Sequence, residues 1–203
     1  MRRLMIIPLV GALVLAAAAP VAAGPNTSNT SGSGRTIQAE WYADSGHGSV
    51  YLFDESNGTY GEFFDESGDY VQCDPSDEYD YRFQGTRIFG WGQDITVALD
   101  TKLRTGTASG DFEIVIETVD ECAWSSEATY DVVHLVVDLT GTGSSATFRS
   151  SGSFKIPGDY NSHDRYRGTE RAATGTVDLG SLGSRDVDWA MMASYSWSEH
   201  SNG

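Results

Sequence analysis

The residues best suited to chemistry lie in one basic stretch, 163–171, of a chain that is otherwise acidic. The stretch reads His-Asp-Arg-Tyr-Arg-Gly-Thr-Glu-Arg. Alternate side chains of an extended strand point to the same face. We therefore expect one face to carry His163, Arg165, Arg167 and Arg171. Guanidinium groups bind carboxylate, sulfate or phosphate through paired hydrogen bonds, so this face is a candidate ligand site.

The same arginines also have an internal use. The formal net charge is −16, so carboxylates are plentiful, including Glu113, Glu117 and the acidic segments near 54 and 65. Each exposed ion pair contributes little to stability. In so acidic a chain, however, we expect these arginines to form ion pairs with the protein's own carboxylates and not to bind a ligand.

Trp91 stands between Gly90 and Gly92. Glycines allow tight turns, and this pattern predicts a hairpin tip that presents an indole ring. A flat, half-exposed ring can bind a sugar, which makes Trp91 a second candidate ligand residue. The alternative, which we favour, is that Trp91 folds over the end of the core, as large aromatic side chains usually do.

The tetrapeptide Phe-Asp-Glu-Ser occurs twice, at 53–56 and 64–67. Carboxylates are preferred ligands of Ca²⁺, so Asp54, Asp65 and Asp69 are candidate calcium ligands. Neither copy matches the spacing of an EF-hand loop. We therefore favour the simpler interpretation, in which Asp, Ser, Asn and Gly form two solvated turns.

No catalytic motif stands out in the chain. The segment Asp44-Ser45-Gly46-His47 contains the residue types of a serine hydrolase, but they fall within one short turn. A catalytic triad needs these groups to converge from separate elements. A pair of carboxylates acting on a polysaccharide remains an alternative, because its defining feature is a distance in space.

Hydrophobic periodicity predicts an all-β fold of about ten strands, packed as one antiparallel β-sandwich or a flattened meander barrel. The segment 129–139 is apolar at successive positions, which predicts a strand covered on both faces. The expected strands include 36–42, 94–100, 112–119, 129–139, 146–156, 166–179 and 186–198.

The N-terminal composition predicts three segments. Residues 1–23 have a basic start, an apolar run and small residues before position 24, as in a signal peptide. Residues 24–35 are mostly Gly, Ser, Thr and Asn, which predicts a flexible leader before a secreted β-domain, 36–203. The chain has two cysteines, Cys73 and Cys122, and a secreted protein is expected to join them in a disulfide.

The distribution of charge argues against some classes of binding partner. Residues 36–81 contain twelve acidic residues and no lysine or arginine, a surface that repels nucleic acid. No segment after the signal peptide is long and apolar enough for a membrane span. We expect a secreted, non-catalytic domain that binds an extracellular glycan or protein. The alternatives are a small polysaccharide hydrolase and a calcium-stabilised surface or structural component.

Overall fold

The computed structural model describes residues 27–156 and 160–202, and they form one large antiparallel sheet with a single short 3₁₀ helix, η1. The signal peptide expected at 1–23 lies outside the described residues. The all-β, antiparallel prediction is confirmed. The strands are β1 (Thr27–Ala43), β2 (Gly46–Glu55), β3 (Gly58–Gln72), β4 (Tyr81–Gln93), β5 (Thr96–Leu99), β6 (Thr105–Asp120), β7 (Ser125–Gly141), β8 (Ala146–Ile156), β9 (Tyr160–Asp178), β10 (Ser184–Asp186) and β11 (Trp189–Asn202), and η1 spans Gly180–Leu182.

The strand pairings form a closed circuit. The order β9-β11-β1-β2-β3-β4-β6 is completed by β7, which pairs with both β6 and β9. All pairings are antiparallel, and tight turns join β1 to β2 and β2 to β3. Among the described residues no helix has the length and apolarity that a membrane crossing requires.

The core fills the inside of this circuit. Inward positions alternate with solvated ones along most strands, as they do when one face of a sheet is buried. In β7, Val133, Leu135 and Val137 are buried, whereas Val132 is 60% exposed. The expectation that 129–139 is covered on both faces is therefore wrong, because the outward side chains Val132 and His134 are exposed in the described structure. The largest fully buried side chains are Phe83, Phe112, Ile37, Leu52, Ile95, Leu103, Ile114, Leu135, Leu179, Met192, Val50 and Val137.

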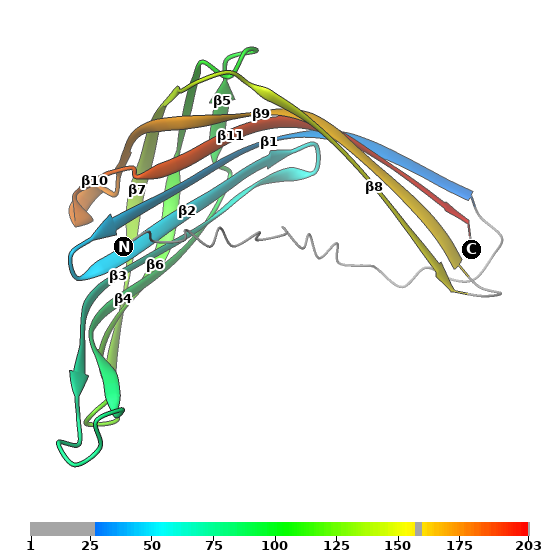
Figure 1. Cartoon of the computed structure of the whole chain (residues 1–203). Helices are drawn as coiled ribbons and strands as arrows, with labels where there is room; N and C mark the ends of the chain where they lie inside the picture. Colours follow the sequence, from blue (N-terminus) through cyan, green and yellow to red (C-terminus); the bar gives the residue numbers. More distant parts are fainter. Residues whose placement is uncertain (1–26, 157–159, 203) are drawn as a thin grey trace, which may run out of the picture.

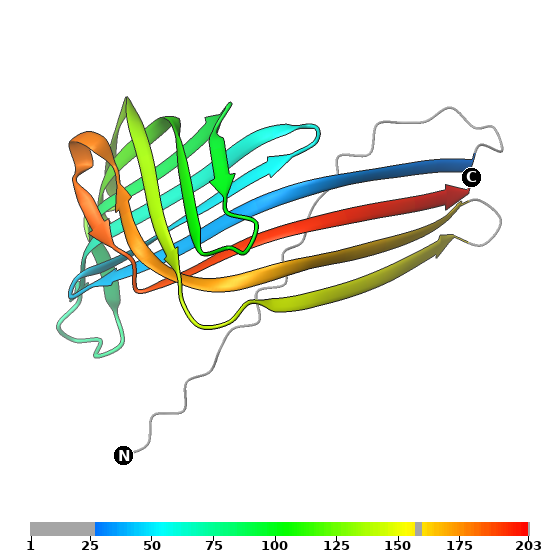
Figure 2. The ribbon, with the colours of Figure 1, turned by 90° about the horizontal axis from the view of Figure 1, so that it is seen from above.

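Four strands continue together well beyond the rest of the sheet and form an arm (Figures 1 and 2). The arm consists of 27–35 of β1, 193–202 of β11, 161–171 of β9 and the whole of β8, in the spatial order β1-β11-β9-β8. The arm accounts for much of the difference between the predicted and observed strand lengths.

Residues 27–35, expected to be a flexible leader, belong to β1 and pair with β11. The glycines in this segment have a packing role. A Cβ atom at Gly32 would lie 2.7 Å from Nε1 of Trp197, and one at Gly34 would lie 2.5 Å from the ring of Tyr195. The aromatic rings of β11 therefore lie over these glycines, and aromatic coverage of strand glycines is a known way of stabilising a sheet edge.

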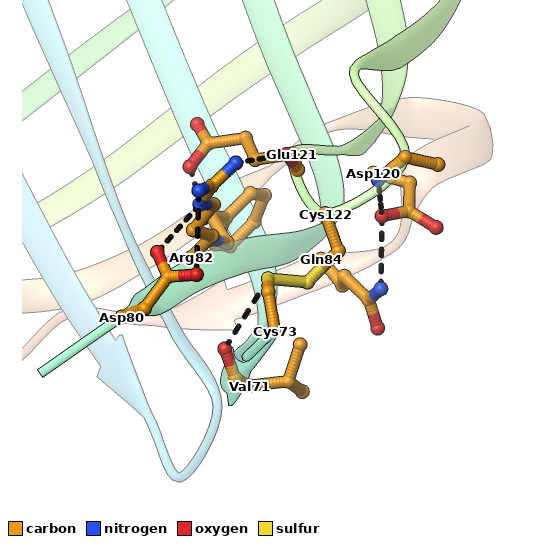
Figure 3. Close-up of a disulfide and its surroundings, with 10 residues drawn as sticks. Val71, Cys73, Asp80, Arg82, Gln84, Asp120, Glu121 and Cys122 are labelled. Atoms are coloured by element: carbon orange, nitrogen blue, oxygen red, sulfur yellow. Dashed lines mark hydrogen bonds and ion pairs between the residues drawn. A yellow bond between two sulfur atoms is a disulfide. The ribbon is translucent and has the colours of Figure 1, made fainter. Parts of the chain in front are cut away.

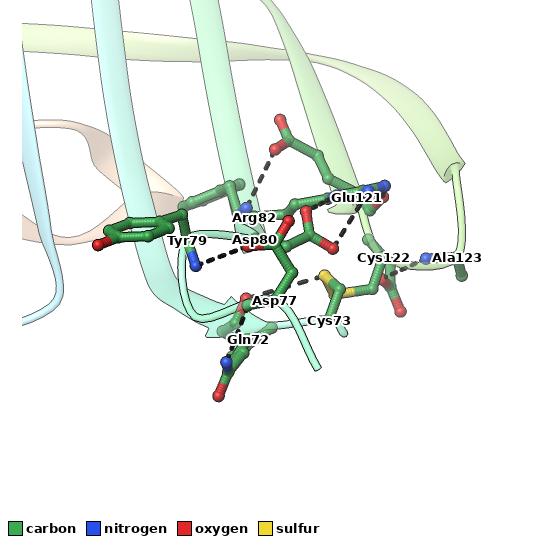
Figure 4. Close-up of polar contacts among 12 residues, drawn as sticks. Gln72, Cys73, Asp77, Tyr79, Asp80, Arg82, Glu121, Cys122 and Ala123 are labelled. Carbon is green, nitrogen blue, oxygen red and sulfur yellow. Dashed lines mark hydrogen bonds and ion pairs between the residues drawn. A yellow bond between two sulfur atoms is a disulfide. The ribbon is translucent and has the colours of Figure 1, made fainter. Parts of the chain in front are cut away.

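The disulfide predicted between Cys73 and Cys122 is confirmed, and it joins the β3–β4 loop to the β6–β7 turn (Figure 3). Polar contacts surround it. Arg82 donates through Nε to Asp80 at 2.7 Å, and the Phe83 amide donates to Glu121 at 3.0 Å. Figure 4 shows that the neighbouring loop is fastened in the same way, with the Tyr79 amide donating to Asp77. This end of the sheet is therefore held by one covalent bond and several local hydrogen bonds.

Replacing both cysteines by serine is expected to destabilise the protein by about 4 kcal/mol, an upper-end value from the chain-entropy model. The two residues are 49 apart in the sequence, so the bond removes considerable freedom from the unfolded chain. Urea unfolding of the double variant and of the native protein, in oxidised form, measures this difference. An unchanged unfolding midpoint would contradict it.

Candidate functional site

The arm brings basic residues of β9 and β8 onto one face. In the antiparallel register Arg167 lies directly opposite Ser196 of β11 on one side and opposite Arg149 of β8 on the other. Directly opposite residues point to the same face of a sheet. Alternate positions along β8 and β9 then add more basic side chains to this face.

We call this surface the cationic face. It continues the core-facing side of the sheet, because Arg35 and Ile37 are alternate residues of β1 and Ile37 is fully buried. Serine, threonine and asparagine side chains fill the positions between the basic residues. The cationic face consists of Arg149, Lys155, His163, Arg165, Arg167 and His200.

Charge is segregated between the two sides of the arm. The acidic residues of its four strands, Asp164, Glu170 and Glu199, all occupy the alternate positions and so lie on the opposite, outer face. The arm's large aromatic side chains also lie on that outer face. They are Phe148, Phe154, Tyr166, Tyr195 and Trp197.

The cationic face has few internal partners. Arg167 donates through Nε to the Ser196 hydroxyl at 3.2 Å, and Arg165 donates to Nε2 of His163 at 3.1 Å. Within 27–156 and 160–202, no carboxylate forms an ion pair with Arg149, Arg165 or Arg167. The expectation that the protein's own acids neutralise the basic stretch is therefore wrong for these arginines.

The acids named for that role lie elsewhere in the molecule. Glu66 accepts from Arg87 at 2.8 Å, and Asp54 pairs with Arg35 at 3.5 Å at the base of the arm. Glu113 lies on the outer face of the sheet, opposite Trp91. Arg165 and Arg167 of β9 are thus left to solvent or to a ligand.

The cationic face is electrostatically unfavourable without a ligand. Arg149 and Arg167 are direct cross-strand neighbours on adjacent strands of the arm. Like charges in directly opposite positions destabilise a sheet by roughly 0.2–1 kcal/mol per pair. An anion held between Arg149 and Arg167 would turn this repulsion into two attractive contacts.

Arg171, also a candidate from the sequence, has a structural role. Its guanidinium donates to the backbone oxygens of Lys102 at 3.2 Å and Gly143 at 2.6 Å. These bonds tie β9 to the β5–β6 and β7–β8 connections. Its Nε is buried and has no hydrogen-bond partner among the described residues. Arg171 therefore belongs to the base of the arm and not to its open face.

Trp91 lies inside strand β4 and not at a hairpin tip. The flanking glycines face the core. A Cβ atom at Gly90 would lie 2.9 Å from Cγ2 of Ile114, and one at Gly92 would lie 3.0 Å from the ring of Phe112. They make room for core side chains, and the prediction of a turn is wrong. Trp91 itself is 47% exposed, so it does not fold over the core.

A shallow hollow of about 340 Å³ adjoins Trp91 on the outer face of the sheet. Glu62 and Glu113 lie directly opposite Trp91 on the two neighbouring strands. Trp91 and the cationic face are on strands that are not neighbours, β4 and β9. They cannot contact one small ligand together, and the acidic surroundings of Trp91 make its environment opposite in charge. The hollow is lined by Trp91, Gly92, Gln93, Asp111, Glu113 and Val132.

The three candidate calcium ligands have separate surroundings. Asp54 pairs with Arg35, whereas Asp65 is buried and accepts from Trp41 Nε1 and Arg185 Nη2, both at 2.9 Å. Asp69 is exposed farther along β3. In the described part of the chain, no group of three or more His, Cys, Asp or Glu residues is arranged to hold a metal ion.

The sequence analysis predicts a turn at both Phe-Asp-Glu-Ser copies, and for the second copy this prediction is wrong. That copy lies within β3, where the alternation of the strand turns Asp65 toward the inside of the sheet. The first copy does lead into the β2–β3 turn. The two copies therefore have different structural roles.

Several carboxyl groups are held in their ionised form. Hydrogen bonds from the Ala123 amide and the Gln84 side chain lower the pKa of Asp120, and the Phe83 amide lowers that of Glu121. The Arg104 side chain lowers the pKa of Asp100 to about 2. A glycosidase acid needs the opposite shift, a raised pKa. These three groups are therefore unsuited to that role.

Comparison of the chain with protein-family models, with curated proteins and with solved structures found no match. Sequence reasoning found His163, Arg165 and Arg167 but missed Arg149, Lys155 and His200. The sequence does contain a pattern that indicates Arg149 and Lys155. Positions 149, 151, 153 and 155 alternate along one predicted strand, and all four are polar or basic.

Proposed function

We propose that this protein is a secreted, non-catalytic domain that binds an anionic polysaccharide, with sulfate or carboxylate groups, on the cationic face of its arm. The observation that supports this most strongly is the segregation of charge. In a chain of net charge −16, the inner positions of β8, β9 and β11 carry five arginine or lysine side chains and no acid, and four of the five lie on the cationic face. Guanidinium groups bind such anions through paired, charge-assisted hydrogen bonds.

An extended ligand fits this surface better than a small one. Arg149 and Lys155 are six residues apart on one strand, which corresponds to roughly 20 Å at about 3.3 Å per residue. Arg149, Arg167 and the histidines cover neighbouring strands about 4.8 Å apart. A polymer with repeated anionic groups can contact several of these positions at once, and multiple weak contacts then add.

A glycan fits better than a nucleic acid. The cationic face has no Phe, Tyr or Trp on which bases would stack, because the arm's large aromatic side chains are on the outer face. Double-stranded DNA also has one charge per about 1.7 Å, so its repulsion from the acidic remainder of the protein is stronger than that of a more sparsely charged polymer. Hydroxyl groups such as those of Ser151, Ser196 and Ser198 can bond to sugar hydroxyls.

The proposal is tested with one polysaccharide in two forms, sulfated and chemically desulfated, by isothermal titration calorimetry. We expect the native protein to bind the sulfated form and not the desulfated form. We also expect the affinity to fall as salt is added, because exposed charges are screened over about 8 Å at physiological ionic strength. Equal binding of the two forms, or an affinity independent of salt, would show that the cationic face is not the binding surface.

A further inference from the structure

The outer edge of β8 has no partner strand within the part of the chain that the structure describes. Ala146–Ile156 pairs with β9 on one side only, and every residue of the strand except Phe148 is exposed. An open edge of this length presents a row of free N–H and C=O groups, which is a template for a further strand. The strand has no proline, and its two charged residues, Arg149 and Lys155, oppose only those registers that bring them face to face.

We infer that β8 pairs antiparallel with β8 of a second copy of this chain, so that two arms form one continuous sheet. The sequence of the strand is self-complementary about Ser151. With Ser151 opposite itself, Phe148 of each copy lies opposite Phe154 of the other, and Ala146 lies opposite Ile156. Cross-strand aromatic pairs stabilise sheets. Phe154 and Ile156 are 59% and 44% exposed in the single chain, and this pairing covers both.

The same register separates the positive charges. Arg149 lies opposite Ser153 of the second copy, and Lys155 lies opposite Thr147. A two-residue slip that centres the pairing on Gly152 would place Arg149 directly opposite Lys155, which like-charge repulsion disfavours. In the Ser151 register, odd-numbered residues lie opposite odd-numbered ones and even-numbered opposite even-numbered. The free N–H groups of each edge therefore lie opposite the free C=O groups of the other.

The pairing closes after two chains, because a two-fold axis at Ser151 uses the same edge of both copies. The axis is perpendicular to the sheet, and the two cationic faces therefore lie on one side of the joined sheet. The dimer would present one cationic surface twice as wide, across the strands, as that of a single arm. The inference itself rests on the edge of β8 and does not depend on the ligand of that surface.

Sedimentation velocity over a range of protein concentrations, without polysaccharide, tests the pairing. We expect the native protein to reach the mass of a dimer. Ser153→Arg should weaken the dimer at least tenfold, because it places an arginine opposite Arg149 of the other copy in both symmetric positions. Ser153→Glu should strengthen the dimer for the opposite reason. A monomer at all concentrations, or a dimer indifferent to both substitutions, would overturn the inference.

A cross-linking experiment separates loss of pairing from loss of folding. Ser151→Cys places two thiols opposite each other at the two-fold axis, so mild oxidation should give a covalent dimer on a non-reducing gel. Ser194→Cys is the matched control, since Ser194 is exposed on β11, away from the edge. Equal cross-linking of the two variants, or none for Ser151→Cys, would contradict the β8 pairing.

Discussion

Replacing Arg149, Arg165 and Arg167 together by serine is expected to weaken binding of a sulfated polysaccharide about 100-fold. A charge-assisted contact on an exposed surface contributes on the order of 1 kcal/mol, so three contribute about 3 kcal/mol, or about two powers of ten in affinity. The fold should persist, because the carbonyl-bound arginine of this strand, Arg171, is retained. Calorimetric titration of the variant, with circular dichroism to check its fold, measures the loss.

The control separates the position of the charges from their sum. Thr118→Asp, Ser125→Asp and Ser126→Asp lower the net charge by the same amount at exposed positions of β6 and β7, away from the arm. This variant should bind within about threefold of the native protein, because screening limits its long-range effect. An equal loss in the two variants would mean that net charge, and not the cationic face, governs binding.

Asp65→Ala is expected to lower the free energy of unfolding by about 3 kcal/mol. The Asp65 carboxylate is buried and accepts hydrogen bonds from Trp41, which is 2% exposed, and from Arg185 of β10. Its removal leaves a buried indole N–H and a guanidinium without their partner. The expected value is at the low end for a broken buried ion pair, because the Arg185 side chain is about one-third exposed. For a domain of this size, the melting temperature should fall by about 6–12 °C.

Asp69→Ala on the same strand is the matched control. Asp69 is exposed, and its replacement should change the stability by less than about 0.5 kcal/mol. Asp65→Asn should fall between the two, since the amide oxygen can still accept from Trp41 but the charge opposite Arg185 is lost. Equal melting temperatures for Asp65→Ala and Asp69→Ala would contradict the structural role of this buried carboxylate.

The local properties of the chain were predictable from the sequence. Period-two alternation predicted β8 with the bounds that the structure has, 146–156, and also placed His163, Arg165 and Arg167 on one face. The disulfide followed from the presence of only two cysteines. Each of these depends on a short stretch of sequence or on a count.

The features that the sequence did not predict depend on which strands pair. Residues 27–35 have the composition of a linker, and they form a strand because β11 supplies hydrogen bonds and aromatic rings that cover Gly32 and Gly34. Gly90 and Gly92 resemble turn residues, but the core side chains facing them require the absence of a Cβ atom. Arg149 joined the site through its register with Arg167. Such long-range pairing is not encoded in the local pattern.

The most direct test of the proposed binding surface is an NMR titration of the native protein with a short sulfated oligosaccharide. We expect the largest backbone and arginine side-chain shift changes at Arg149, Arg165 and Arg167 and in the adjoining part of β11, with residues around Trp91 unchanged. Changes centred on Trp91, or spread evenly over the molecule without saturation, would contradict the assignment of the cationic face as the ligand site.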